Sequence, residues 1–202
     1  MHDIYTEMKI LVFSDIHGNL PAAEAMLKKV GPVDSYICLG DIVNYAPWSN
    51  ECVDLVNSFK NCIIIRGNHE EIFMNGNYPG KNKVVQAFFN YCYPSFDRLR
   101  GINNWPEQYS DKNFIFRHTL NDKYIYFDTP LELNNNYIIG HSHHQFTRRQ
   151  NNFRIHNTGS VGQNRRYINV INYTLYYPQT NTLKPQSLIY NVDLVINEMK
   201  IR

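Results

Sequence analysis

The sequence has little of what marks membrane, secreted or strongly charged proteins. None of its apolar runs approaches the roughly 20 residues that a membrane-spanning helix needs. The N-terminal residues show no signal-peptide pattern. The formal net charge is only +2, which is too small to indicate a nucleic-acid or membrane partner by itself. We therefore expect a cytoplasmic protein without a membrane partner, for which nucleic acid is permitted as a ligand but not indicated.

Cysteine is also scarce. The four cysteines lie within apolar stretches and form no Cys-x-x-Cys pair: Cys38, Cys52, Cys62 and Cys92. This pattern argues against a disulfide framework and a thiolate zinc site, and it predicts buried free thiols in a reducing compartment. A length of 202 residues suits one domain with a substantial core. We expect that domain to span residues 1–202, with a polar tail at residues 1–7, and we predict no oligomeric state.

What the sequence does contain is a repeated arrangement in which a short apolar run ends in polar residues. The first run is Lys9 to Phe13, which is followed by Ser-Asp-Ile-His-Gly-Asn and then by a helix-like run. Asp15 and His17 are two residues apart on a predicted strand-to-helix turn, so both can point at one metal ion. Asn19 suits the cap of the following helix. Alone, Asp-x-His is a weak signal, because surface aspartates and histidines meet often by chance.

Five further apolar runs end in the same way. Their terminal clusters are Gly40-Asp41, Gly67-Asn68-His69, His118, Gly140-His141-Ser142-His143 and Asn157-Thr158-Gly159-Ser160. Short apolar runs bounded by glycine are typical of fully buried strands. In layered α/β folds, ligands bind at the carboxyl ends of the strands. We therefore expect these clusters to meet in space.

The remaining pattern predicts the other elements. Helices are expected over residues 20–30, 49–59, 83–100 and 192–199, and a turn-rich segment over 75–82. Residues 121–133 are expected to form a loop with a short helix or turn near 124–127. Strands are expected over 166–172, 174–177 and 183–190, the last two joined as a hairpin. The aromatic residues of the segment 83–100 are expected in the core, with the alternative that one or two roof a substrate mouth.

The ordered set Asp-x-His, Gly-Asp, Gly-Asn-His, His and Gly-His-x-His resembles the calcineurin-like metallophosphoesterase superfamily, and most closely its small single-domain phosphodiesterase branch. Residues 50–53 and 159–162 also resemble that branch. The resemblance implies an α/β fold, a four-layer α/β/β/α sandwich with two mixed sheets and the metal site at the strand ends. It further implies a dinuclear metal-dependent phosphoesterase, with a phosphodiesterase favoured, that hydrolyses a small phosphoester substrate by attack of a hydroxide bridging two metal ions.

Seven residues match the metal ligands of that family. By resemblance, the first ion is held by Asp15, His17, Asp41 and His143. The second is held by Asp41, Asn68, His118 and His141, so that Asp41 bridges the two. Carboxylate, imidazole and amide donors suit divalent ions. We expect Mn²⁺ first, with Fe²⁺, Zn²⁺, Ni²⁺ or Mg²⁺ as alternatives.

His69 matches the family histidine that protonates or stabilises the leaving oxygen, and it is the expected catalytic residue. Arg66 and Arg165 are candidates for binding the substrate phosphate, because a guanidinium matches its oxygens. Each of the two could equally be a surface or structural arginine. The remaining histidines, His2, His144 and His156, are not expected to be ligands.

The sequence departs from the family pattern in two places. Thr119 follows His118 where the family usually has glycine, which puts the close backbone approach there in question. The protein-phosphatase branch has Gly-Asp-x-x-Asp-Arg-Gly, whereas residues 40–46 read Gly-Asp-Ile-Val-Asn-Tyr-Ala. No carboxylate is therefore available at that place to pair with His69. This argues against a phosphoserine phosphatase or a symmetrical dinucleoside-tetraphosphate hydrolase of that branch.

Two alternatives stay open. A non-catalytic scaffold on the same fold would resemble the retromer subunit with this architecture, which lacks the catalytic histidine. The presence of His69 and all seven ligands disfavours that reading. A nucleic-acid end-processing phosphatase would use the same site, and the mild basicity and the dense aromatic residues permit it without selecting it.

Overall fold

The computed structural model describes residues 7–201, and its strands form two five-stranded mixed sheets that pack on each other. Sheet A has the order β10-β9-β1-β2-β3 and consists of β1 (Ile10–Phe13), β2 (Ser35–Cys38), β3 (Cys62–Ile64), β9 (Val170–Tyr177) and β10 (Thr182–Ile189). Sheet B has the order β4-β5-β6-β8-β7 and consists of β4 (Gln108–Ser110), β5 (Ile115–Arg117), β6 (Tyr137–Ile139), β7 (Phe146–Gln150) and β8 (Phe153–Asn157).

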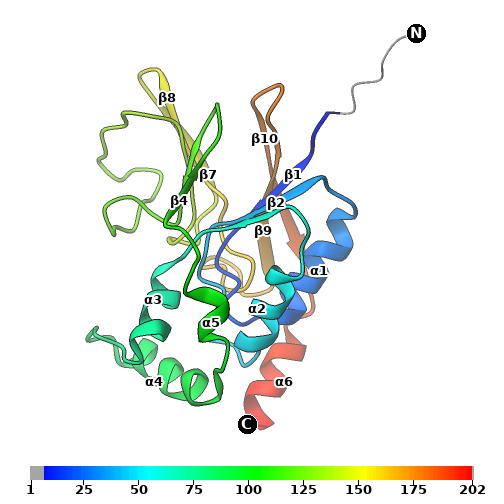
Figure 1. The fold of residues 1–202 in the computed structure, drawn as a ribbon, viewed down its shortest axis with the longest axis vertical. Coiled ribbons are helices and arrows are strands. Elements are labelled where there is room, and N and C mark those ends of the chain that lie inside the picture. Colours follow the sequence, from blue (N-terminus) through cyan, green and yellow to red (C-terminus); the bar gives the residue numbers. More distant parts are fainter. Residues whose placement is uncertain (1–6, 202) are drawn as a thin grey trace.

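The helices gather around sheet A, whereas β4, β7 and β8 lie apart from them (Figure 1). The helices are α1 (Leu20–Val30), α2 (Ser49–Asn57), α3 (Asn68–Asn75), α4 (Lys83–Cys92), the 3-10 turn η1 (Tyr93–Ser95), α5 (Leu99–Ile102) and α6 (Asp193–Ile201). The two mixed sheets and their flanking helices confirm the expected fold class. None of the helices in the described part of the chain combines the length and hydrophobicity that a membrane span requires.

Alternate residues of β1 face different layers, because successive side chains of a strand point to opposite faces. Leu11 and Phe13 pack into the cluster beneath the helices. Ile10 and Val12 pack into the cluster between the sheets. That inner cluster draws on both sheets, with Ile37, Leu39, Ile65, Phe114, Phe116, Ile138 and Tyr176. The sheets are therefore held at a fixed distance by a closed apolar layer, which aligns their strand ends.

The outer side of sheet B differs from the expected four-layer arrangement, because an irregular segment packs there in place of a helical layer. From the chain between β5 and β6, Leu120, Ile125 and Leu133 pack with Ile139 and Ile155 in a third apolar cluster. Turns at residues 121–122 and 127–128 occur where the loop with a short helix or turn was expected. This segment begins directly after β5, so it also borders the strand ends.

Several elements differ from the sequence-based prediction. The helix predicted over 83–100 is broken into α4, η1 and α5, because Pro94 lacks the amide hydrogen that a continuing helix needs. The strands predicted over 166–172 and 174–177 are one strand, β9. The helix α3 and the strands β4 and β7 were not predicted. Both strands lie at the edges of sheet B and carry no apolar run.

The structure describes all four cysteines but only one residue of the expected tail. The four cysteines are free: Cys38, Cys52 and Cys92 are buried, and Cys62 is partly buried. The expected tail at residues 1–7 lies outside the described residues, except for Glu7.

Asn19 links the start of α1 to two distant segments. Its side-chain oxygen accepts a hydrogen bond from the Ala22 amide at 3.1 Å, which caps the helix as expected. Its amide nitrogen donates to the Gly162 carbonyl at 3.0 Å and to the Tyr190 hydroxyl at 2.8 Å. The side chain is buried, so removing it leaves polar partners without water to replace it.

We expect Asn19→Ala to lower the free energy of unfolding by about 2–3 kcal/mol, because it removes both a helix cap and two buried hydrogen bonds. Asn82 is the matched control, since it caps α4 by accepting from the Val84 and Val85 amides but is exposed. Asn82→Ala should cost about 1 kcal/mol or less. Urea denaturation measures both, and equal losses would contradict a linking role for Asn19.

Candidate metal centre

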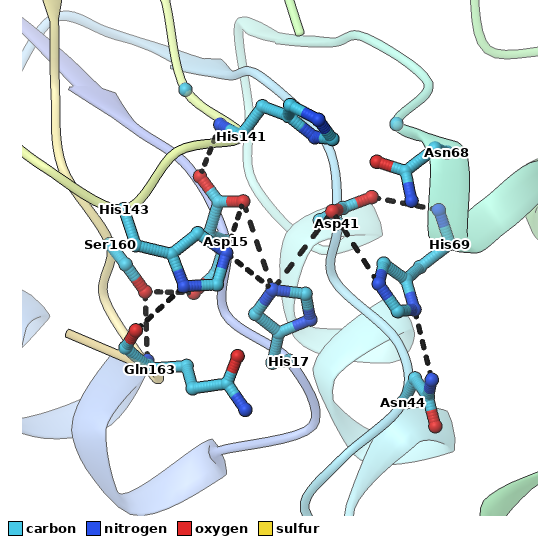
Figure 2. A network of polar contacts seen from close by, with 12 residues as sticks. Asp15, His17, Asp41, Asn44, Asn68, His69, His141, His143, Ser160 and Gln163 are labelled. Atoms are coloured by element: carbon cyan, nitrogen blue, oxygen red, sulfur yellow. Dashed lines mark hydrogen bonds and ion pairs between the residues drawn. The ribbon is translucent and has the colours of Figure 1, made fainter. Parts of the chain in front are cut away.

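The carboxyl ends of the parallel strands in both sheets deliver the predicted site residues to one place (Figure 2). Asp15 and His17 follow β1, and Asp41 follows β2. His118 follows β5, and both His141 and His143 follow β6. The ligands were expected in loops at the strand ends. Asn68 and His69 are instead the first two residues of α3. All seven predicted ligands and His69 are thus brought together, as the strand-end argument predicts.

The backbone of this region is strained. Five of the seven predicted ligands have left-handed φ values: Asp15 at 57°, His17 at 51°, Asp41 at 54°, His141 at 67° and His143 at 59°. Residues other than glycine rarely adopt this conformation, which costs of order 1–3 kcal/mol each and concentrates at functional sites. The loops are therefore shaped to aim these side chains rather than to minimise local backbone energy.

Glycines beside the ligands allow the loops to approach one another. A Cβ atom added to Gly67 would lie 2.3 Å from Asp41 Oδ1, and one added to Gly140 would lie 2.7 Å from Asp15 Oδ2. Contacts this short exclude any side chain at either position. The glycines that precede Asn68 and His141 in the sequence motifs thus make room for the aspartates.

The first group of donors consists of Asp15, His17 and His143. The Nε2 atoms of His17 and His143 face each other at 3.1 Å, and Asp15 Oδ1 lies 3.2 Å from His143 Nε2. Each histidine turns its Nδ1 to a backbone carbonyl: that of Val43 at 3.3 Å for His17, and that of Gln163 at 2.6 Å for His143. These contacts leave the Nε2 lone pairs facing the group. Asp15 Oδ1 is buried without a hydrogen-bond partner, which fits a cation.

The second group contains Asp41, His118 and His141. His118 Nε2 lies 3.1 Å from Asp41 Oδ2, from His141 Nδ1 and from Asn68 Oδ1. His118 Nδ1 lies 2.8 Å from the Leu39 carbonyl, which again directs Nε2 inward. Four donors of types that bind divalent ions therefore converge on one point.

Thr119 stands where the family usually has glycine, and it leaves His118 in contact with the other donors of the second group. Its hydroxyl donates to the Lys123 carbonyl at 2.5 Å and so points along its own loop. The His118 carbonyl accepts a hydrogen bond from the Gly140 amide at 3.0 Å, which ties the two ligand loops together.

Burial and mutual charge determine the protonation of the centre. Burial raises the pKa of Asp15, but the neighbouring imidazoles bring it down to about 2, and they hold that of Asp41 well below its usual range. Burial lowers the pKa of His17 strongly and that of His141 to about 4. Burial also opposes protonation of His118, yet the Asp41 charge raises its pKa to about 10. Ionised carboxylates beside mostly neutral imidazoles are the state that binds a metal ion, and the positive charge at His118 stands where a cation would be stabilised.

His69 lies beside both groups. Its backbone amide donates to Asp41 Oδ1 at 2.8 Å, and its Nε2 lies 4.0 Å from Asp41 Oδ2. Asn44 Nδ2 donates to His69 Nδ1 at 2.9 Å, an arrangement that places the ring proton on Nε2, toward the centre. His17, Asp41 and His69 also satisfy the distances of a metal-binding group. The ring can therefore act as a proton donor or as a ligand.

Glu70 is a residue of this region that the sequence analysis missed. It is fully buried, and its carboxylate accepts backbone hydrogen bonds from Asp41 at 2.8 Å, Ile42 at 2.7 Å, Val43 at 3.2 Å and Gly67 at 2.8 Å. Burial, reinforced by the Asp41 charge, raises its pKa to about 7 against the effect of these bonds. It holds the Asp41 loop against the start of α3. Its position three residues after Gly67, as in half of a capping box, was the available signal.

The two predicted arginines lie differently. Arg66 is partly buried and paired, with Nη2 3.0 Å from Glu107 Oε1 and Nε 3.5 Å from Glu71 Oε1. Arg165 is exposed and lies two residues after Gln163, whose carbonyl is 2.6 Å from His143 Nδ1 at the edge of the centre.

The other histidines in the described chain stay outside both groups. His156 is buried and hydrogen-bonds Thr147 Oγ1 at 2.8 Å and Thr174 Oγ1 at 2.7 Å. His144 is exposed, and its Nδ1 hydrogen-bonds the backbone two residues earlier. His2 lies outside the described residues.

Known proteins share both the sequence pattern and the fold. A family model described as calcineurin-like phosphoesterase matches residues 8–197. The uncharacterized protein MJ0912 of Methanocaldococcus jannaschii is 29% identical over 200 residues, which cover 83% of this chain and 82% of that protein. The crystal structure of a metallophosphoesterase from Sphaerobacter thermophilus has a TM-score of 0.81 and 25% identity, covering 97% of this chain and 94% of that chain. The hypothetical protein PH1004 from Pyrococcus horikoshii OT3 has a TM-score of 0.80 and 17% identity, covering 96% of this chain and 93% of that chain.

The family match thus spans nearly the whole chain, and its range includes the strand ends at which buried carboxylates and imidazoles converge. This chain belongs to the calcineurin-like phosphoesterase family and is a metal-dependent hydrolase of phosphoric esters.

Proposed function

We propose that the chain is a phosphodiesterase that works with two divalent metal ions. The observation that carries the proposal is the position of Asp41 between two groups of buried donors. We assign Asp15, His17, Asp41 and His143 to one ion, and Asp41, Asn68, His118 and His141 to the other. Mn²⁺ is our first choice because the donors are oxygen and imidazole nitrogen without thiolate.

Two bound ions would supply an activated water as nucleophile and would neutralise charge on the phosphate. The chain's own residues then have to manage the leaving oxygen and hold the substrate. His69 can donate its Nε2 proton to the leaving oxygen, because the Asn44 amide occupies Nδ1. Arg165 is the better candidate for binding phosphate, since Arg66 is already paired with two glutamates.

A cavity reaches the centre at one ligand, His143. It has a volume of about 550 Å³, and its lining continues from His143 through His144, Arg166 and Tyr167 to residues of β9 and β10. Ligand pockets commonly have volumes of about 300–1,000 Å³. A cavity of this size supports a phosphoester with a sizeable organic group, and a phosphodiester is the form that we propose.

We expect the protein, after loading with Mn²⁺ and desalting, to retain about two ions per chain by metal analysis. Asp41→Asn should reduce this number and abolish hydrolysis, because one carboxylate serves both ions while the new side chain still accepts from the His69 amide. His144→Gln is the matched control for metal content, since His144 lies in the same loop as His143 but outside both groups. A folded wild-type protein that retains no metal would contradict the proposal.

We expect His69→Ala to slow hydrolysis of an alkyl phosphodiester by roughly 10²–10⁴-fold and that of a nitrophenyl phosphodiester far less. The reason is that nitrophenolate leaves readily as an anion, whereas an alkoxide needs a proton. Turnover of both esters and the metal content should be measured on the same preparation.

The outcomes separate the two roles that the position of His69 allows. Unchanged metal content with unequal slowing supports a proton donor. Equal slowing of both esters would identify a phosphate-binding group instead, and loss of metal would identify His69 as a ligand.

A further inference from the structure

Two tyrosines that the sequence analysis did not single out flank the metal centre. The Tyr45 ring meets His17 edge-on, with centroids 4.8 Å apart, and packs at a tilt on His69 at 5.1 Å. The Tyr124 ring stacks on His141, with centroids 4.2 Å apart and an interplanar angle of 23°. Aromatic rings therefore cover the donors from two sides.

The backbone holds Tyr45 in an unusual conformation. Its φ is 68°, and that of Asn44 is 74°, in the region that bulky residues rarely occupy. The next amide, that of Ala46, donates to the His17 carbonyl at 3.0 Å and fixes the loop on the first ligand loop. Strain of this kind persists only where the surroundings impose it. The Tyr45 ring is thus held in place before any substrate binds.

Tyr124 is held as firmly, although 56% of its surface is exposed. A tight turn with positive φ at both Asn121 and Asp122 precedes it. Ile125, which follows it, is buried, and the Ile125 carbonyl accepts from Ser142 Oγ at 2.7 Å. One face of the ring is taken by His141, so the exposed surface is available to a ligand. A fixed and exposed aromatic face is suited to stacking with another flat ring.

Arg165 brings a positive charge to the edge of the centre. It is exposed, and it lies two residues after Gln163, whose carbonyl is 2.6 Å from His143 Nδ1. A guanidinium on this segment can bind a phosphate oxygen at the edge of the donor groups.

We propose that the substrate of this site carries a planar aromatic ring, which stacks on Tyr124 while its phosphate is bound by Arg165. This inference rests on the proposed function, because it takes the phosphate to lie at the donors. The inference adds that Tyr124 favours esters whose organic group is a planar ring, because such a ring can stack on the exposed surface of the tyrosine.

The test compares two phosphonates on the Mn²⁺-loaded full-length protein by isothermal titration calorimetry. Phenylphosphonate and cyclohexylphosphonate carry the same acid group and the same number of carbons, and only the first ring is planar and aromatic. Phenylphosphonate should bind roughly two- to tenfold more tightly, the range expected for a stacked aromatic pair. Tyr124→Leu should remove this preference. The matched control Tyr126→Leu should keep it, because Tyr126 packs on His144 and not on a ligand.

Equal binding of the two phosphonates to wild-type protein that retains two ions, or a preference that survives Tyr124→Leu, would overturn the stacking proposal alone. Failure to retain metal would overturn the proposed function and this inference with it. Metal content measured on every variant separates these cases, and the melting temperature identifies any variant that fails to fold.

Discussion

The structure depends on the convergence of buried charge at one edge of two packed sheets. Asp15 and Asp41 lie among five imidazoles, with donor atoms as close as 3.1 Å and almost no contact with water. Two imidazole nitrogens facing each other at that distance cannot both carry a proton. Several backbone carbonyls already occupy the other ring nitrogens. Such a set is stable only when something positive lies between its members, which is why the metal centre dominates the architecture.

The loops that carry these residues stabilise one another. The amides of Asp15 and His17 donate to the carbonyls of Gly40 and Asp41 at 2.9 and 3.0 Å, which joins the first two ligand loops. Glu70 fastens the Asp41 loop to the start of α3. Ser160 Oγ donates to the Asp15 carbonyl at 2.8 Å, which explains why a segment without ligands belongs to the motif pattern. The left-handed φ values of the proposed ligands are the local conformational cost of holding these loops against one another.

The sequence predicts which side chains come together at the centre, because each proposed ligand lies in a short polar cluster after an apolar strand. Strand ends of parallel sheets meet at one edge whatever the connecting loops do, so Asp15 and His143 could be placed together across 128 positions of chain. Glu70 was missed because its only sequence signal is half of a capping box, which does not show that the carboxylate also accepts hydrogen bonds from the distant Asp41 loop. Tyr45 and Tyr124 were missed because their importance comes from tertiary contacts with His17 and His141. The edge strands β4 and β7 were missed because edge strands lack the apolar run that marks buried ones.

The central claim is that two metal ions share Asp41. Anomalous diffraction from crystals of the Mn²⁺-loaded protein, with data on both sides of the manganese edge, tests it most directly. The account predicts two peaks, one among Asp15, His17 and His143 and the other among Asn68, His118 and His141, with Asp41 between them. A single peak, or a peak away from Asp41, would contradict it.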